Sequence, residues 1–126
     1  MATLKTNTLT GTSTAGSIAV TGEGNSTTTN LQQGLCKVWI KTPADGASIS
    51  DSFNVSSATD SSTGQVIVNI ANDMANANYA IGISTLTNVD QTLIVSDATG
   101  SYDMRTWNGV NYADIGMRTV VAGDLA

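Results

Sequence analysis

The residues best suited to bind a ligand lie close together in the segment YDMRTWNGVNYADIGMR, residues 102–118. Trp107 and Tyr112 offer aromatic rings, Arg105 offers a cation and Asn108 offers an amide. Aromatic rings pack on the apolar faces of sugars, and amide groups hydrogen-bond to sugar hydroxyls. These four residues are therefore a candidate glycan- or partner-binding platform. The alternative is that Trp107 and Tyr112 contact another subunit or are covered by the N-terminal segment.

A tight hairpin is expected to position this platform. Asn108-Gly109 between β-prone flanks is the preferred two-residue type I′ turn. The register of such a hairpin places Trp107 opposite Val110 and Arg105 opposite Tyr112. The core-facing side then carries Tyr102, Met104, Ala113, Ile115 and Met117. The outward side carries Asp103, Arg105, Trp107, Tyr112, Asp114 and Arg118.

The same register sets Asp103 opposite Asp114, which is a mildly destabilising pair of like charges. Arg105 and Arg118 are close enough in this hairpin to relieve the repulsion, and a bridging Ca²⁺ ion is the alternative. Because the sequence has no D-x-[DN]-x-[DN]-G loop, we favour the arginines and expect no metal site.

Residues that could support catalysis are scarce. The chain has no histidine, so the commonest general base and the usual activator of a serine or cysteine nucleophile are missing. The single cysteine, Cys36, alternates with Val38 and is expected to be a small core residue. We therefore expect a protein that is not an enzyme, with no catalytic residues and no cofactor.

The rest of the chain from Leu35 onward shows an alternation of apolar and polar residues with a period of two. Apolar residues alternate in LCKVWIK, QVIVNI, NYAIGIST and QTLIVS, and turn-rich clusters such as TDSSTG separate these segments. Short strands at this spacing predict an all-β fold, an antiparallel β-sandwich (jelly-roll-like or Ig-like) over residues 35–126.

Trp39 is the tryptophan of the first of these strands. It lies between Lys37 and Lys41 on the face opposite Cys36, Val38 and Ile40. A strand that is apolar on one face and carries tryptophan on the other is often covered on both sides. Trp39, with Phe53, is thus a candidate subunit contact. The alternative is that Trp39 folds over the edge of its own sheet.

The first 34 residues have a different composition. Thirteen of them are Ser or Thr, and the larger aliphatic residues besides Met1 are few. Ordering such a segment costs some tens of kcal/mol at roughly 1–2 kcal/mol per residue, more than a few aliphatic side chains can offset. Residues 1–34 are therefore expected to be an extended assembly arm that neighbouring chains hold in place. Its anchor residues would be Leu4, Leu9, Ile18, Val20 and Leu31. The alternative is a tail that lies on its own domain.

The charge pattern limits the partners. The net charge is −5, and no basic run is present, so nucleic acid is not an expected partner. No apolar stretch approaches the ~20 residues of a membrane-spanning helix, and the N-terminus lacks a secretory signal pattern. Membrane insertion and secretion are therefore not expected.

Two stretches carry a resemblance to a known group of proteins. These are VTGEGNSTTTNLQQGLCKVW, residues 20–39, and DSFNVSSATDSSTGQVIVNIANDMANANYAIG, residues 51–82. They resemble small virion structural proteins of tailed, mostly marine, bacteriophages, described as tail-fibre or fibre-like proteins. GMRTVVAGD, residues 116–124, resembles the terminal strand of that family. One departure is Cys36, which stands where the family pattern has alanine.

The resemblance implies a structural subunit of a phage virion, assembled in the host cytoplasm. Fibre proteins of this kind commonly form homotrimers, and their partners are other virion proteins of the tail or capsid. A short tail fibre or fibre adaptor is the first hypothesis. A capsid-decorating protein is the second, and a carbohydrate-binding module that contacts host surface glycan through Trp107 and Tyr112 is the third.

Overall fold

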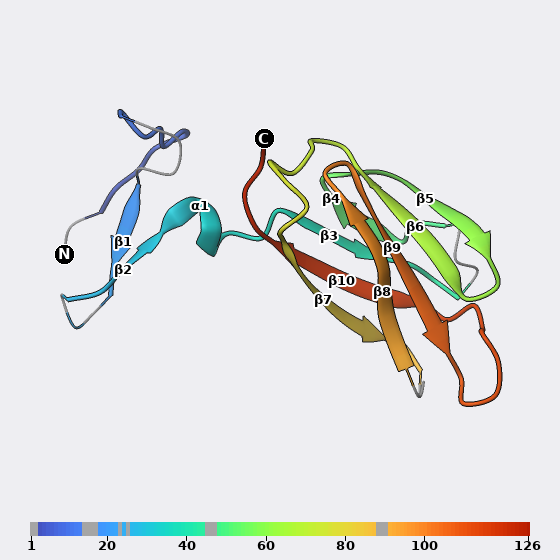
Figure 1. Ribbon diagram of the computed structural model, residues 1–126. Helices are drawn as coiled ribbons and strands as arrows, with labels where there is room; N and C mark the ends of the chain where they lie inside the picture. Colours follow the sequence, from blue (N-terminus) through green and yellow to red (C-terminus); the bar gives the residue numbers. More distant parts are fainter. Residues whose placement is uncertain (1–2, 14–17, 23, 25, 45–47, 88–90) are drawn as a thin grey trace. The chain divides into compact units, whose positions relative to one another are not determined.

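The computed structural model describes residues 3–13, 18–22, 24, 26–44, 48–87 and 91–126. The chain forms two compact units, Met1–Leu35 and Cys36–Ala126. Regular structure is almost entirely β, and every strand pair is antiparallel (Figure 1). The all-β class expected from the alternating pattern is confirmed.

The first unit contains a small hairpin and one helical turn. Strands β1 (Ala19–Thr21) and β2 (Thr28–Asn30) pair with each other, and α1 (Leu31–Gly34) follows directly. The side chain of Asn30 accepts a hydrogen bond from the backbone N–H of Gln33 at 3.1 Å and so caps the helix. Part of the segment that we expected to be extended is therefore locally folded, whereas residues 3–13 lie outside any strand or helix.

The second unit is a β-sandwich of two four-stranded sheets that face each other (Figure 1). We call them sheet I and sheet II. Sheet I has the order β4-β3-β10-β7, and sheet II has the order β5-β6-β9-β8. The strands of sheet I are β3 (Val38–Lys41), β4 (Asp51–Phe53), β7 (Ala80–Thr85) and β10 (Met117–Ala122). Those of sheet II are β5 (Val55–Ser62), β6 (Gln65–Ile70), β8 (Gln91–Ala98) and β9 (Ser101–Trp107).

Alternate residues of both sheets fill the space between them. In β6, for example, Val66, Val68 and Ile70 are buried while the residues between them are half-exposed, as the period of two predicted. In β3 the inward residues are Val38 and Ile40, also as predicted. The buried apolar core consists of Val38, Ile40, Val66, Val68, Ile70, Met74, Tyr102, Met104, Met117 and Val121.

The turn after β9 differs from the expected hairpin. Trp107 is paired with Tyr112, and the backbone N–H of Asn108 donates to the carbonyl of Asn111 at 3.0 Å. The two central residues are therefore Gly109, with φ of 93°, and Val110, rather than Asn108 and Gly109. The register is shifted by two residues from the prediction, and an even shift keeps each side chain on its expected face.

The strand that follows this turn belongs to the other sheet. The N–H of Ala113 still donates to the carbonyl of Thr106, but β10 pairs with β3 and β7 of sheet I. The expected pairing of Asp103 with Asp114 is therefore wrong. The Asp114 carboxylate accepts a hydrogen bond from the N–H of Gly64, which fixes the crossing segment to the β5–β6 turn.

Two further segments of sheet II depart from expectation. Residues 59–62 were expected to be part of a turn, but β5 continues to Ser62, as a largely exposed strand with two register shifts. In β8, Leu93 and Val95 are both exposed, and the register with β9 shifts between Ile94 and Ser96. The alternation in QTLIVS predicts that Leu93 and Val95 share the apolar face, but Ile94 packs on the core instead.

Candidate interaction surfaces

An apolar row crosses the outer face of sheet I. The strand register pairs Phe53 of β4 with Trp39 of β3, Trp39 with Val120 of β10, and Val120 with Gly82 of β7. The exposed fractions of Phe53 and Val120 are 52% and 50%, and Trp39 is half-buried. We call these four residues the Trp39 row.

Strand alternation explains why the row faces outward. Val38 and Ile40 flank Trp39 and point into the core, as do Thr119 and Val121 on either side of Val120. The row ends at Gly82, where a Cβ atom would lie 3.3 Å from Cγ1 of Val120. Gly82 has no side chain, so Val120 contacts only the backbone of β7 at this position. Within the described part of residues 36–126, Trp39 and Phe53 are thus neighbours on an outer sheet face that leaves both partly exposed.

A polar row runs beside the Trp39 row. The register pairs Asp51 with Lys41, Lys41 with Arg118, and Arg118 with Ser84. Asp51, Lys41 and Arg118 are exposed. An apolar strip with a charged border is the usual composition of a protein interface, in which an apolar centre is surrounded by a polar rim.

The structure brings together the two residues that the sequence suggested as subunit contacts, Trp39 and Phe53. Sequence reasoning missed Val120 and Gly82. The alternation within β10 indicates that Val120 faces outward, but only the strand register shows that it lies next to Trp39. Lys37, which the sequence places on the same strand face as Trp39, is buried, with 4% of its surface exposed.

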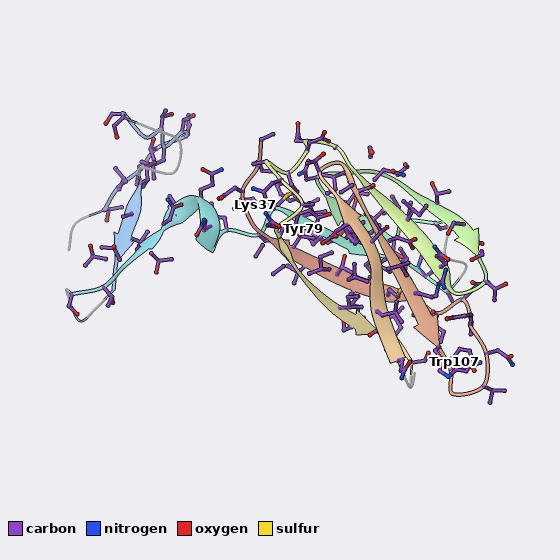
Figure 2. The ribbon with its side chains drawn as sticks, viewed as in Figure 1. Lys37, Tyr79 and Trp107 are labelled. Atoms are coloured by element: carbon purple, nitrogen blue, oxygen red, sulfur yellow. The ribbon has the colours of Figure 1, made fainter. Side chains whose placement is uncertain are left out.

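A second cluster contains three of the four residues of the predicted platform. The ring centroids of Trp107 and Tyr112 lie 5.1 Å apart with an interplanar angle of 78°, and Cζ of Arg105 lies 4.9 Å from the centroid of the Tyr112 ring. Trp107 is at the end of β9, at the opposite end of the sandwich from Lys37 and Tyr79 (Figure 2). The predicted grouping of Arg105, Trp107 and Tyr112 is therefore observed.

A partly buried polar network holds Arg105 in this position. Nη2 of Arg105 donates to Oε1 of Gln65, and Nε2 of Gln65 donates to Oδ2 of Asp103. Asp103 is 8% exposed, and its other carboxylate oxygen, Oδ1, makes no hydrogen bond within the described part of the chain. Asp103 was expected on the solvent side of this sheet, yet the side chains around it exclude water.

Asn108 has a different role from the one expected. Its Oδ1 accepts hydrogen bonds from the backbone N–H groups of Val110 and Asn111, at 3.0 and 2.9 Å. This side chain shapes the loop and does not offer its carbonyl oxygen to a ligand.

The rings of Trp107 and Tyr112 are nearly perpendicular, so they cannot both stack on one sugar ring, because a sugar face contacts coplanar rings. One ring at most can present its face.

The predicted anchor residues of the N-terminal unit differ in exposure. Leu4 is 79% exposed and Leu9 is 54% exposed, and Val20 on β1 is similar to Leu9. Ile18 and Leu31 are half-buried, and the N–H of Leu31 donates to the carbonyl of Ile18 at 2.8 Å. Ile18 and Leu31 therefore lie at the base of the hairpin, whereas Leu4 and Leu9 extend from an irregular segment.

Groups that could carry chemistry are dispersed among the described residues. Cys36 is exposed, against the expectation of a core position, and its thiol lies 3.2 Å from the carbonyl oxygen of Val38. No group of three or more His, Cys, Asp or Glu residues within the described ranges is arranged to hold a metal ion. In the same part of the chain, no helix has the length and apolar character needed to cross a bilayer.

No known protein-family model matches the chain, and no curated protein or solved structure is significantly similar to it.

Proposed function

We propose that this protein is a non-enzymatic structural subunit of the virion of a tailed bacteriophage, acting as a short tail fibre or fibre adaptor. It assembles as a homo-oligomer, a trimer as is common among the fibre proteins it resembles, and binds other virion proteins. The Trp39 row carries this proposal, because Trp39 and Phe53 share a partly exposed sheet face and lower the free energy of association when a partner covers them. The resemblance of residues 20–39 and 51–82 to fibre-like proteins supports the virion assignment.

The experiment that tests assembly compares two substitutions on outer sheet faces. Phe53→Ser changes the Trp39 row, and Leu93→Ser changes an exposed apolar residue on the outer face of sheet II. Sedimentation velocity over a concentration series is expected to show a wild-type oligomer that Phe53→Ser dissociates and Leu93→Ser does not. Equal behaviour of the two variants would contradict the assignment of the interface to sheet I.

The position of the protein on the particle distinguishes two structural roles. A tail fibre or adaptor lies at the tail, whereas a capsid-decorating protein lies across the head lattice. Immunogold labelling or cryo-electron microscopy of purified virions, with particles that lack the protein as the control, separates these roles. Absence of the protein from purified particles would overturn both.

A carbohydrate-binding role is favoured by one observation, the exposed ring of Tyr112 beside Trp107 and Arg105. Such a module would bind a host surface glycan through one ring face and the Arg105 guanidinium. A glycan array tests this, with Trp107→Ala as the variant that should lose binding while it keeps its melting transition. Absence of binding by the wild-type protein removes this candidate.

A further inference from the structure

One edge strand of the sandwich lacks the features that prevent strand pairing between molecules. As the described residues define them, the edges are β4 and β7 of sheet I and β5 and β8 of sheet II. β4 has three residues and begins with Asp51; β5 has two register shifts, and β8 has one. β7 is six residues long, pairs without interruption with β10, and contains no charged residue and no proline. Short strands, charges and bulges protect edges, so β7 is the unprotected one.

The hydrogen-bonding pattern shows which backbone groups of β7 face the open edge. The N–H of Leu86 donates to the carbonyl of Gly116 at 2.9 Å, in register with the β7–β10 ladder. Because bonded and non-bonded positions alternate in an antiparallel pair, Ser84 and Gly82 bond to β10. The N–H and C=O groups of Ile81, Ile83 and Thr85 therefore point away from β10, and no other described strand pairs with them.

A matching segment occurs in the N-terminal unit. Residues 3–10 are exposed, lie outside any strand, and make no backbone–backbone hydrogen bond with a described residue. Their sequence, TLKTNTLT, has four threonines and two leucines but neither proline nor glycine, and it is long enough to cover six residues of β7. Lys5 and Glu23 are the charged residues of residues 1–35, so the net charge of −5 resides in residues 36–126. The charge of Lys5 is thus opposite in sign to the net charge of residues 36–126.

We infer that residues 3–10 of one copy add a fifth strand to sheet I of another copy, alongside β7. This inference rests on the homo-oligomer of the proposed function and names the segment and the edge that join its subunits. Main-chain hydrogen bonds at Ile81, Ile83 and Thr85 supply the pairing, as in other cases of strand addition. Head-to-tail donation of this kind gives a closed ring, such as a trimer, when the rotation between neighbouring copies closes, and an open filament when it does not.

Cross-linking between isotopically different copies tests the pairing directly. A photoreactive benzoylphenylalanine replaces Ser84 in full-length protein, and ¹⁴N- and ¹⁵N-labelled preparations are mixed, dissociated and reassembled. Mass spectrometry is expected to find residue 84 joined to peptides from residues 3–10, with mixed ¹⁴N–¹⁵N pairs. Cross-links from residue 84 to residue 84 would indicate β7–β7 pairing instead, and unmixed pairs would indicate that a chain's own segment is bound. Either result overturns the inference.

Two proline substitutions provide a matched control. Thr85→Pro removes an N–H that faces the open edge, whereas Ser84→Pro removes one that bonds to β10. Thr85→Pro is expected to weaken association at least tenfold with little change in the melting transition, and Ser84→Pro to lower the melting temperature. Thr6→Pro/Thr8→Pro should weaken association as Thr85→Pro does, with no additional effect when the substitutions are combined. Oligomers that dissociate with Phe53→Ser but resist Thr85→Pro would overturn the edge pairing and leave the proposed function standing.

Discussion

The phenol oxygen of Tyr102 and Oγ1 of Thr119 lie 2.5 Å apart in the core and form a hydrogen bond between the two sheets. Tyr102 is on β9 of sheet II, and Thr119 is on β10 of sheet I. Both side chains are buried, so the bond satisfies two hydroxyl groups that have no access to water. Burial raises the pKa of Tyr102 to about 12, although the hydrogen bond with Thr119 opposes this shift.

The raised pKa of Tyr102 predicts a loss of stability at alkaline pH. Between pH 10 and about 12 the phenol is ionised in the unfolded chain but keeps its proton in the folded chain, so rising pH favours unfolding. The free energy of unfolding should be unaffected by this group below pH 10 and fall by about 2–3 kcal/mol as the pH rises through 12. Urea titrations at a series of pH values measure this slope.

Tyr102→Phe is the control for the alkaline slope, because it removes the titrating hydroxyl. The variant should show a smaller fall between pH 10 and 12, whatever its stability at neutral pH. Some slope should remain, since burial and the nearby Asp97 also raise the pKa of Tyr79. A wild-type slope in Tyr102→Phe would mean that other groups control alkaline unfolding.

Tyr79 makes a second link between the sheets. Its hydroxyl donates to the carbonyls of Ala98 and Ser101, at 2.8 and 3.0 Å, and so attaches the start of β7 to the turn between β8 and β9. Tyr79→Phe should lower the free energy of unfolding by about 1 kcal/mol, because it leaves these carbonyls without their donor. Tyr112→Phe is the matched control, since the Tyr112 hydroxyl makes no hydrogen bond with a described residue. Equal effects in the two variants would contradict the assigned role.

The sequence was most informative where a strand buries one face. In β3, β6 and β7 the alternation of apolar and polar residues indicates which side chains pack in the core, so the inward residues were predicted without knowledge of strand partners. β5 could not be found in this way, because it is an exposed edge strand whose course is set by pairing with β6. Its serines and threonines are equally typical of a turn.

The strands that pair with β10 could not be predicted from the residues near it in the sequence. Asn108-Gly109 suggested a local hairpin, yet contacts with residues far away in sequence direct the chain to the other sheet. Oγ1 of Thr42, for example, accepts a hydrogen bond from the N–H of Met117. The same limit applied to the Trp39 row, because its members are recognisable as outward apolar residues but become neighbours only through the register of β4, β3 and β10.

Gly64, in the β5–β6 turn, is predicted to be more sensitive to substitution than Gly109, in the loop after β9. Its φ is +74°, and a Cβ atom there would lie 2.7 Å from the backbone nitrogen of Ala113 and 2.8 Å from the carbonyl oxygen of Thr106. Gly64→Ala should cost more than ~2 kcal/mol, since the conformational penalty alone is about 1–2 kcal/mol and the backbone must also move. Gly109→Ala, with a positive φ in an exposed loop, should cost about 1 kcal/mol. Denaturant midpoints that reverse this order would contradict the contact.

The Gln65 side chain is predicted to stabilise the buried Asp103 carboxylate. Gln65→Ala removes a hydrogen bond to Asp103 and one from Arg105, so about 1–3 kcal/mol of stability should be lost. Gln91→Ala, at an exposed position on β8, should change stability by less than about 0.5 kcal/mol.

A double-mutant cycle separates this network from simple packing. Asp103→Ala removes the carboxylate whose Oδ1 already lacks a partner, so in the Gln65→Ala background it should restore part of the lost stability. Urea unfolding of the four proteins in the cycle measures this coupling free energy. Strictly additive losses would show that Gln65 and Asp103 act independently.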